Sequence, residues 1–343
     1  MATTVIGEGV EAQDLSDTER PPKSVFEGVA ALNSDLKLDA QVPILPRYKV
    51  SQNVDTLSPL RYPGSKKKII SSLVCLIEAN GPFPDVFVEP FAGGASVSLG
   101  LLQMNAVKRV ILADWDPMIA ALWLECGENS QRLISDMYDE PVTLSRWDYW
   151  RNSDPKTPRE LALKCLFINR TSFSGIMNGS AGPIGGRSQQ SKYKIDCRFN
   201  KDGLAKRIES YAKLYSEGRI VAKHQSWQET LDETKCHPDS ALIYADPPYI
   251  EKAGKLYVPE FTLHDHRLLA TELLQQVDRP WIISYDHEPL ALDLYQSTNG
   301  VHTYRVEHSY TMKGHRRQQP VPGREVLFTN LPVMPSEIQT KGI

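Results

Sequence analysis

Four consecutive residues, Asp246-Pro247-Pro248-Tyr249, combine one carboxylate, two rigid prolines and one aromatic ring. They follow the apolar run 241–245, which is typical of a strand buried on both faces of a parallel sheet. Each proline removes a backbone donor and fixes φ near about −65°, so the chain must leave the sheet here with its side chains in a nearly fixed relation. Open α/β sheets bind ligands at this carboxyl edge, and the pattern therefore predicts a catalytic turn at Asp246, Pro247, Pro248 and Tyr249.

The chemistry that suits this turn is the methylation of a planar exocyclic amine, such as N6 of adenine. That amine is a poor nucleophile because its lone pair is delocalised into the ring. Acceptors at Asp246 and the carbonyl of Pro247 can bind its two hydrogens and leave the lone pair facing a methyl donor. Tyr249 can stack on a base swung out of the duplex, a contact worth roughly 1–3 kcal/mol. The alternative is an ordinary surface turn, since Asp and Pro both favour turns.

A second candidate region precedes this turn and suits a nucleoside. The expected strand 85–89 ends at Glu89 and runs into Pro90-Phe91-Ala92-Gly93-Gly94, followed by an expected helix over 96–102. The next expected strand, 109–114, ends in Asp114, whose carboxylate can accept hydrogen bonds from ribose hydroxyls. The glycines lack the GxGxxG spacing, which disfavours a pyrophosphate cofactor such as NAD. Asp116 is the alternative acidic residue, although it also suits the cap of the following helix.

A turn-rich segment, 58–66, leads into an expected helix with apolar positions at 69, 70, 73, 76 and 77. Free backbone donors next to Gly64 and Ser65, together with the charge of Lys66, favour a carboxylate at the helix start. Further strands are expected at 281–285, 301–308 and 325–329, the last two as an antiparallel pair. Thr262 and Asp265 resemble a capping box that opens a helix reaching Val277.

The composition is that of a globular protein, with 41% hydrophobic and 24% charged residues among 343. We expect a cytoplasmic, nucleoid-associated protein, because no apolar run approaches the ~20 residues of a membrane span and no signal peptide begins the chain. The five cysteines form no CxxC pair, so reduced thiols are expected and neither disulfides nor a zinc site. The expected organisation is a mobile tail over 1–55, a catalytic domain formed by 56–141 and 219–332, a recognition region over 142–218, and a second tail over 333–343.

The net charge of −3 hides an uneven distribution. Residues 142–225 hold sixteen basic and seven acidic residues, a local net charge of +9, which indicates a surface for nucleic-acid phosphates. A solvated positive face is the alternative. Within this part, a polar excursion that starts at Asn169 is long enough to suggest a binding loop, with a disordered insert as the alternative. Its candidate DNA contacts are Asn169, Arg170, Arg187, Lys192, Lys194 and Arg198, joined by Arg316 and Arg317 from the connection between the last two strands. For Asn169 and Arg170, which lie close to an expected helix end, the alternative is that they support the loop and do not read bases.

Taken in order, these motifs resemble those of the Dam-type DNA adenine N6-methyltransferases, the D12 class, over roughly residues 57–332. Five family motifs match Tyr62 to Lys66, Pro90 to Ala95, Asp114, Asn169 to Arg198 and Asp246 to Tyr249. Two positions depart from the family pattern, because Ser65 and Ala95 stand where glycine is usual, and alanine tolerates fewer backbone angles. The recognition segment matches only loosely, so it does not indicate a target sequence.

The resemblance implies an α/β fold with a doubly wound, mostly parallel Rossmann-like sheet and an inserted target-recognition region. It implies S-adenosylmethionine as the cofactor and no metal. Double-stranded DNA is the implied substrate, with cognate restriction or defence proteins as candidate partners and no membrane. The implied cofactor residues are Tyr62, Gly64, Lys66, Glu89, Pro90, Phe91, Gly93 and Asp114. Two other readings stay open: methylation of RNA or of a protein amide, and a DNA-binding subunit that has lost catalysis.

Overall fold

The structure is a computed structural model that describes residues 42–45, 57–61, 66–177, 179–237, 240–248, 261–286, 289–309 and 322–333. Its contacts divide the chain into two compact units, Met1–Gln41 and Val42–Ile343, and all of the described residues belong to the second.

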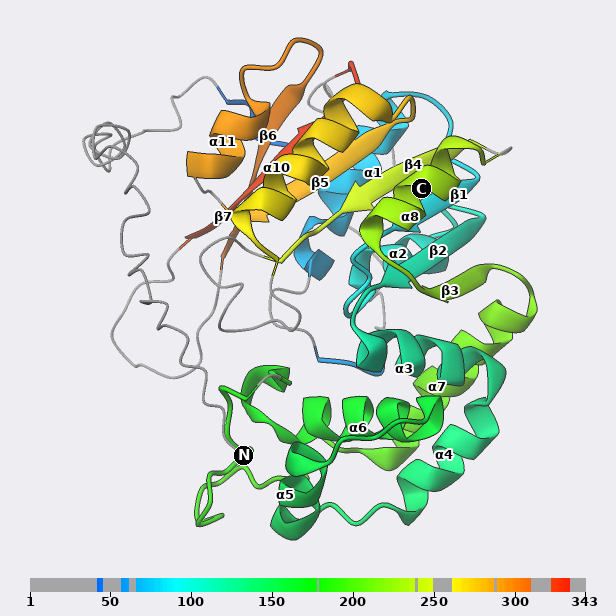
Figure 1. The fold of residues 1–343 in the computed structure, drawn as a ribbon, viewed down its shortest axis with the longest axis vertical. Coiled ribbons are helices and arrows are strands. Elements are labelled where there is room, and N and C mark those ends of the chain that lie inside the picture. The colour runs from blue at the N-terminus through cyan, green and yellow to red at the C-terminus, as the bar shows by residue number, and fades with distance from the viewer. Residues whose placement is uncertain are drawn as a thin grey trace, which may run out of the picture. The chain divides into compact units, whose positions relative to one another are not determined.

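The second unit is built on one seven-stranded sheet with the order β3-β2-β1-β4-β5-β7-β6 (Figure 1). Strands β1 to β5 run parallel to one another, whereas β7 pairs antiparallel with both β5 and β6. The chain order reverses between β1 and β4, which is where open α/β sheets bind their ligands. The strands are β1 (Val86–Glu89), β2 (Arg109–Asp114), β3 (Ile220–His224), β4 (Ala241–Ala245), β5 (Trp281–Asp286), β6 (His302–Ser309) and β7 (Pro322–Thr329).

Helices flank the sheet and also form a separate helical region. In Figure 1 the helices α4 to α7 occupy the lower half of the view and the sheet occupies the upper half. The helix α3 joins the two, because it packs on β3 as well as on α6 and α7. The helices are α1 (Ile70–Ala79), α2 (Ser96–Gln103), α3 (Pro117–Glu128), α4 (Ser130–Asp139), α5 (Leu144–Asn152), α6 (Pro158–Thr171), α7 (Lys201–Ser216), α8 (Trp227–Lys235), α10 (Leu263–Thr271) and α11 (Pro289–Tyr295).

Short helical turns complete the list of elements. A 3-10 turn, η2 (Lys66–Ile69), leads into α1, and a second one, η3 (Phe173–Gly175), follows α6. A π-helical turn, η4 (Glu272–Gln276), follows α10. The single helix expected from Thr262 to Val277 is thus divided into an α-helical and a π-helical part.

The central strands are buried because their sequences are almost wholly apolar. All residues of β1 and β4 are buried, and so are five of the six residues of β5. This agrees with strands covered on both faces, and it confirms the predicted α/β class with a mostly parallel, doubly wound sheet. The predicted antiparallel pair near the C-terminus is also confirmed by β6 and β7. The capping box is present, since Thr262 and Asp265 exchange hydrogen bonds at the start of α10.

Two segments differ from the sequence-based expectation. Residues 42–45, assigned above to the N-terminal tail, contact the edge of the sheet: Leu45 donates to the carbonyl of Arg305 at 3.0 Å and is buried in the core. The polar excursion was expected to begin at Asn169, but α6 continues to Thr171. Its last three side chains are buried, so tertiary packing extends the helix beyond the point where its apolar periodicity ends.

No helix among the described residues is long and apolar enough to cross a membrane. All five cysteines are free thiols, as expected.

Candidate active site

The sequence-predicted carboxylate Asp246 lies at the carboxyl end of β4, directly after a fully buried strand. The neighbouring strand β1 ends in Glu89, and β2 on its other side ends in Asp114. Three carboxylates from three adjacent strands therefore lie along one edge of the sheet, at the position where the chain order reverses. Pro247 and Pro248 follow Asp246 and end the strand, as the sequence indicates.

Lys66 contacts the predicted catalytic turn directly, at Asp246. Its Nζ lies 2.8 Å from Oδ1 of Asp246 and 3.7 Å from Oε1 of Glu325, and only 2% of its side chain is exposed. Glu325 comes from β7 and is 3% exposed, whereas Asp246 is 23% exposed. Lys66 was predicted to bind the carboxylate of a cofactor, and the structure adds that this lysine is paired with two of the protein's own carboxylates.

A second hydrogen bond fixes the orientation of Asp246. Ser284 Oγ on β5 donates to Oδ1 of Asp246 at 2.9 Å, and the Tyr244 hydroxyl lies 2.9 Å from the same Ser284 oxygen. Because the Ser284 proton is used toward Asp246, the Tyr244 hydroxyl must donate to Ser284. Both contacts of Asp246 involve Oδ1, and among the described residues no group hydrogen-bonds to Oδ2. Oδ2 is thus available to an incoming donor.

Burial and mutual repulsion perturb the acidic groups of this edge. Burial raises the pKa of Glu89 to about 8, the charges of Asp246 and Asp114 raise it as well, and a hydrogen bond from Ser98 opposes the shift. Burial also raises the pKa of Asp114 to about 7, with a further contribution from Asp116. Buried carboxylates that repel one another are stabilised by a cation, so this edge suits a positively charged ligand.

The turn after β1 is held by hydrogen bonds on both sides of Gly93. Its N–H donates to Oδ2 of Asp114 at 2.7 Å, and its carbonyl accepts from the Trp123 indole at 3.0 Å. Gly93 has φ +44°, and Ala95 has φ +49° in the left-handed region that favours glycine. Ala95 adopts this conformation despite its Cβ, which answers the question raised by its departure from the family pattern.

The two acidic candidates after β2 have different roles in the structure. Asp116 accepts from the N–H of Met118 at 2.8 Å and caps α3. Asp114 accepts from Gly93 and from the N–H of Asp116. Asp116 is therefore committed to the helix, whereas Asp114 links the glycine turn to the end of its strand.

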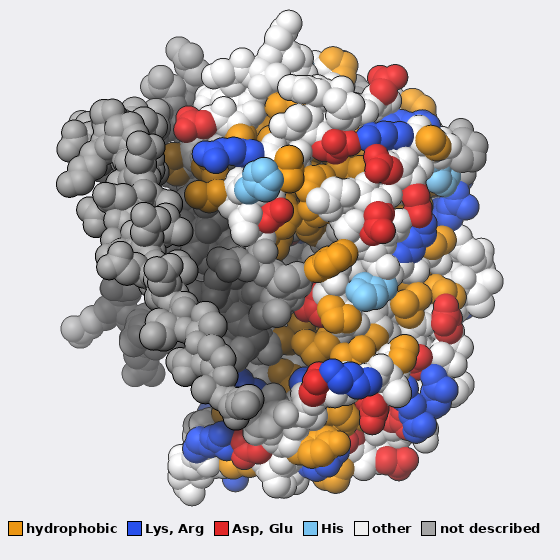
Figure 2. All heavy atoms as spheres, viewed as in Figure 1, with side chains coloured by type: hydrophobic (Ala, Val, Ile, Leu, Met, Phe, Trp, Pro, Cys, Tyr) orange, Lys and Arg blue, Asp and Glu red, His pale blue; other side chains and the backbone are white. Residues whose placement is uncertain are grey.

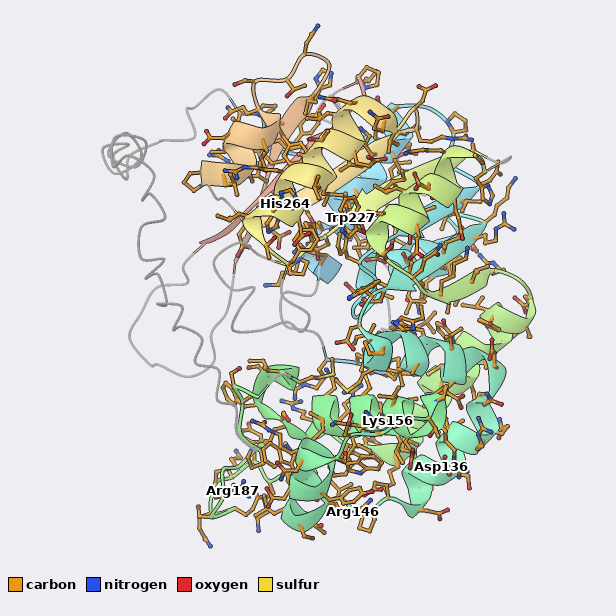
Figure 3. The ribbon with its side chains drawn as sticks, viewed as in Figure 1. Asp136, Arg146, Lys156, Arg187, Trp227 and His264 are labelled. Atoms are coloured by element: carbon orange, nitrogen blue, oxygen red, sulfur yellow. The ribbon has the colours of Figure 1, made fainter. Side chains whose placement is uncertain are left out.

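Aromatic rings gather beside this edge. Phe91, from the glycine turn, meets Phe261 edge-on with a centroid distance of 5.5 Å, and Phe261 also contacts Trp227 and His266. Phe261 therefore links Trp227, the first residue of α8, to His266 of α10; Figure 3 labels Trp227 and the neighbouring His264 of α10. Pro90 is buried.

Asn169 and Arg170 lie in the interior rather than on a DNA-facing surface. Asn169 is fully buried, and its amide bonds to both the N–H and the carbonyl of Arg61 and to the carbonyl of Gly175. Arg170 is 8% exposed and donates through Nε to the carbonyl of Pro59. Both side chains thus connect α6 to the segment that precedes Lys66. Both are buried at the end of α6, an arrangement that agrees with the alternative that they support the loop, and their contact with DNA stays a prediction.

Several arginines cluster around this contact. Burial, and after it the positive charges of Arg207, Arg61 and Arg198, lower the pKa of Arg170 to about 9. Burial and the charge of Arg198 likewise lower the pKa of Arg61, and Arg207 donates to the carbonyl of Ser58. A nearby anion would reduce the repulsion between these guanidinium groups.

The remaining loop candidates are exposed. Arg187, Lys192, Lys194 and Arg198 all lie on the surface between α6 and α7, and Arg187 forms an ion pair with Asp148 at 2.7 Å. Figure 3 shows Arg187 beside α5, in the helical region. The loop is held by an internal bridge between Ser172 and Pro183 and by buried Ile184 and Ile195, so its described residues form a packed loop rather than a disordered insert.

The positive surplus of the middle segment does not form one patch on the face drawn in Figure 2. Basic and acidic side chains are interspersed over the visible described residues. Ion pairs within the helical region account for part of this mixing, including Arg146 with Glu140 and Arg159 with Asp136. Net charge alone is therefore a poor guide to where a duplex binds.

Tyr62, Gly64, Tyr249, Arg316 and Arg317 lie outside the described residues. Within the described ranges, no group of three or more His, Cys, Asp or Glu side chains could hold a metal ion.

Sequence reasoning missed several residues that surround the site, among them Ser284, Glu325, Ser98 and Arg207. A signal existed for two of them, because Ser284 interrupts the apolar strand Trp281–Asp286, and Glu325 stands beside the apolar run of β7. A polar residue in a buried strand needs a partner, so such positions point to buried polar contacts.

The comparison with known proteins agrees with this geometry. Residues 62–312, more than half of the chain, match the model of a family described as the D12 class N6 adenine-specific DNA methyltransferase. The Type II methyltransferase M.MjaIII of Methanocaldococcus jannaschii is similar at 25% identity over 212 residues, which cover 55% of this chain and 68% of that protein.

Proposed function

Because the chain belongs to the D12 class of N6 adenine-specific DNA methyltransferases, we propose that it transfers a methyl group from S-adenosylmethionine to N6 of adenine in double-stranded DNA. The observation that carries this proposal is how the two carboxylate oxygens of Asp246 are bonded. Its Oδ1 is held by Lys66 and Ser284, and its Oδ2 is available at the reversal point of the sheet.

The described residues fit this cofactor. S-adenosylmethionine carries a sulfonium and an ammonium. Burial raises the pKa values of Glu89 and Asp114, and a cation bound beside these carboxyl groups would favour their ionised forms. When bound, the cofactor supplies a methyl group that its sulfonium has already activated. Asp114 and the backbone around Gly93 would hold the nucleoside, with Phe91 beside the base. Tyr62, Gly64, Lys66 and Pro90 complete the proposed cofactor set.

The protein's contribution is position and electrostatic environment. Asp246 Oδ2 and the carbonyl of Pro247 accept the two amine hydrogens, so the N6 lone pair points along the line of the displacement. The target base must leave the duplex to reach this edge, and Tyr249 is the proposed stacking partner. Since the Lys66 ammonium holds only Oδ1, it orients the carboxylate without covering the oxygen that binds the substrate.

DNA binding is assigned to the loop between α6 and α7 and to the arginines beneath it. Phe173 and Tyr193 are 66% and 58% exposed, which leaves their rings available for stacking on bases. Arg187, Lys192 and Lys194 offer phosphate contacts at the surface, and Arg198 and Arg61 offer them near the cluster. Arg316 and Arg317 remain proposed contacts.

Charge removal tests this assignment. The triple substitution Arg187→Ala, Lys192→Ala and Lys194→Ala should weaken duplex binding and reduce the log–log salt slope by about 0.9 for each lost phosphate contact. A matched control removes Lys108, Lys156 and Lys213, three exposed lysines elsewhere, and should leave the slope unchanged. If the two triple variants bind alike, the loop is an ordinary solvated surface.

Two other readings make different predictions. A methyltransferase acting on RNA or on a protein amide would label those substrates and leave DNA unmodified, and an inactive DNA-binding subunit would label nothing. The chain keeps Lys66, Gly93, Asp114 and Asp246, which a pure binding module does not need. The name of its Type II relative supports a role beside a restriction enzyme, and a cognate restriction or defence protein is the proposed partner.

The direct experiment is to express the chain in cells that lack N6-methyladenine and to sequence their DNA by a method that detects this base. The proposal expects N6-methyladenine at one short sequence context, and its absence from cells that express Asp246→Ala. Unmodified DNA from cells that contain the folded wild-type chain would reject the proposal.

A further inference from the structure

Glu325 is a buried carboxylate at the active edge that none of the sequence motifs includes. It lies on β7, two strands away from β4, and its backbone register pairs it with Asp286 of β5 and Val306 of β6. Its Oε1 lies 3.7 Å from the Nζ of Lys66. The same Nζ lies 2.8 Å from Oδ1 of Asp246. One ammonium thus lies between two carboxylates, from elements far apart in the sequence.

We propose that Glu325 is a positioning residue for methyl transfer, which acts through Lys66 by sharing its ammonium with Asp246. This inference rests on the proposed function, since it assigns Asp246 as the acceptor of the amine hydrogens. Without Glu325, the Lys66 ammonium would lose one of the two carboxylates that contact it. The shared contact keeps the Lys66 ammonium beside Oδ1 of Asp246. It also leaves more negative charge on the Asp246 carboxylate for the substrate.

The geometry explains why the sharing is effective. Coulomb energies fall inversely with distance, so the attractions at 2.8 and 3.7 Å are of similar size. Both attractions are screened less in this buried site than they would be in water. Lys66 and Glu325 are both almost wholly buried, so neither charge is screened by solvent. Ser284 supports Asp246 from the other side, which holds the carboxylate while Lys66 is drawn toward Glu325.

The ionisation of Glu325 then becomes a measurable property of the site. Burial raises the pKa of Glu325 to about 7; Asp246 and Asp286 raise it, and Lys66 lowers it. The charged groups facing it are Lys66 from η2, Asp246 after β4 and Asp286 from β5, while β6 places Val306 in register. Among the described side chains, Lys66 is the cation that opposes the shift.

The sign of the pH effect follows. Above about pH 7, Glu325 is ionised and shares Lys66, and the proposal assigns this state the faster transfer. As the pH falls below this value, Glu325 binds a proton and no longer competes with Asp246 for the Lys66 ammonium, and Asp246 becomes a weaker acceptor. The methylation rate should therefore rise with pH through the neutral range, as a single ionisation does.

The test compares purified wild type with Glu325→Gln and Glu325→Asp in single-turnover DNA methylation at saturating duplex and cofactor. The matched control is Glu140→Gln, which removes the charge of another buried glutamate paired with a basic residue, in the helical region. Rates are measured between about pH 6 and 9, alongside the dissociation constants of duplex and cofactor.

The expected result is a rate about tenfold lower for Glu325→Gln at pH 8, the scale of one lost charge contact, with both dissociation constants nearly unchanged. Its pH profile should lose the ionisation assigned to Glu325, whereas any contribution from Asp114 and Glu89 should be common to wild type and variant. Glu325→Asp keeps the charge and should retain the ionisation at an intermediate rate. Glu140→Gln should keep the wild-type profile.

A wild-type rate for Glu325→Gln overturns the proposal. A slow Glu325→Gln variant whose rate depends on pH in the same way as that of wild type overturns it as well. If Glu325→Gln does not fold, the wild-type profile decides by itself, because a rate without any ionisation between about pH 6 and 8 is incompatible with the proposal. A wild-type chain that methylates no DNA rejects the proposed function instead, so the two failures are distinct.

Discussion

Replacing Asn169 by alanine should cost about 3–5 kcal/mol of stability, because three hydrogen bonds depend on its amide. The substitution leaves the carbonyl of Gly175 without its partner in a fully buried contact, worth up to about 3 kcal/mol. It also removes both bonds to the Arg61 backbone, which are half-buried and worth about 1 kcal/mol each. The sum is a large part of the ~5–15 kcal/mol that stabilises a typical domain.

Urea unfolding followed by circular dichroism measures this loss through the shift of the midpoint. Asn169→Asp should be at least as damaging, because its carboxylate keeps the bond from the Arg61 N–H but faces two carbonyl oxygens. Asn152→Ala is the matched control, since Asn152 is exposed and makes one bond to the carbonyl of Asp148, and it should cost no more than about 0.5 kcal/mol. A loss below about 1 kcal/mol for Asn169→Ala would refute the role assigned to the buried amide.

Three further predictions concern the active edge. Asp114→Ala should weaken S-adenosylmethionine binding by about 1–3 kcal/mol in calorimetry, with a smaller effect of Asp116→Ala; equal and negligible losses would mean that the ribose is held elsewhere. The pKa of Glu89 is raised to about 8 in the folded chain, so protonated Glu89 contributes stability that is fully present below its unfolded pKa and is lost as the pH rises through about 8. The melting temperature of Glu89→Gln should therefore exceed that of wild type at about pH 8.5 and not at about pH 5. Lys66→Met should cost up to about 3–5 kcal/mol, because it removes the ammonium that two carboxylates share, and adding Glu325→Gln should recover part of this loss. A melting temperature that does not respond to the second change contradicts the buried ion pair.

The local features of the site could be predicted from the sequence because they depend on short-range rules. The apolar runs at 86–89 and 241–245 are buried strands, and the prolines after Asp246 end the second of them. Asp116 also behaves as its position before Pro117 indicates, as the cap of α3. In each case, the residue types within about ten positions determine the outcome.

The features that could not be predicted depend on contacts between distant segments. Lys66 and Glu325 are brought together by the strand order, which places β7 beside β5, and nothing near either residue specifies that neighbour. Asn169 has the composition of a loop residue, yet the packing of α6 against the segment before Lys66 buries it completely. Surface and interior polar residues look alike in a sequence, and only tertiary packing separates them.

The central claim is that Asp246 binds the amine that receives the methyl group. Its most direct test is single-turnover formation of N6-methyladenine by the Asp246→Ala and Asp246→Asn variants, with S-adenosylmethionine binding measured on the same samples. We expect no detectable methyl transfer by Asp246→Ala and at most a trace by Asp246→Asn, with the affinity for S-adenosylmethionine largely retained in both variants. Transfer by the Asp246→Ala variant at the wild-type rate would contradict it.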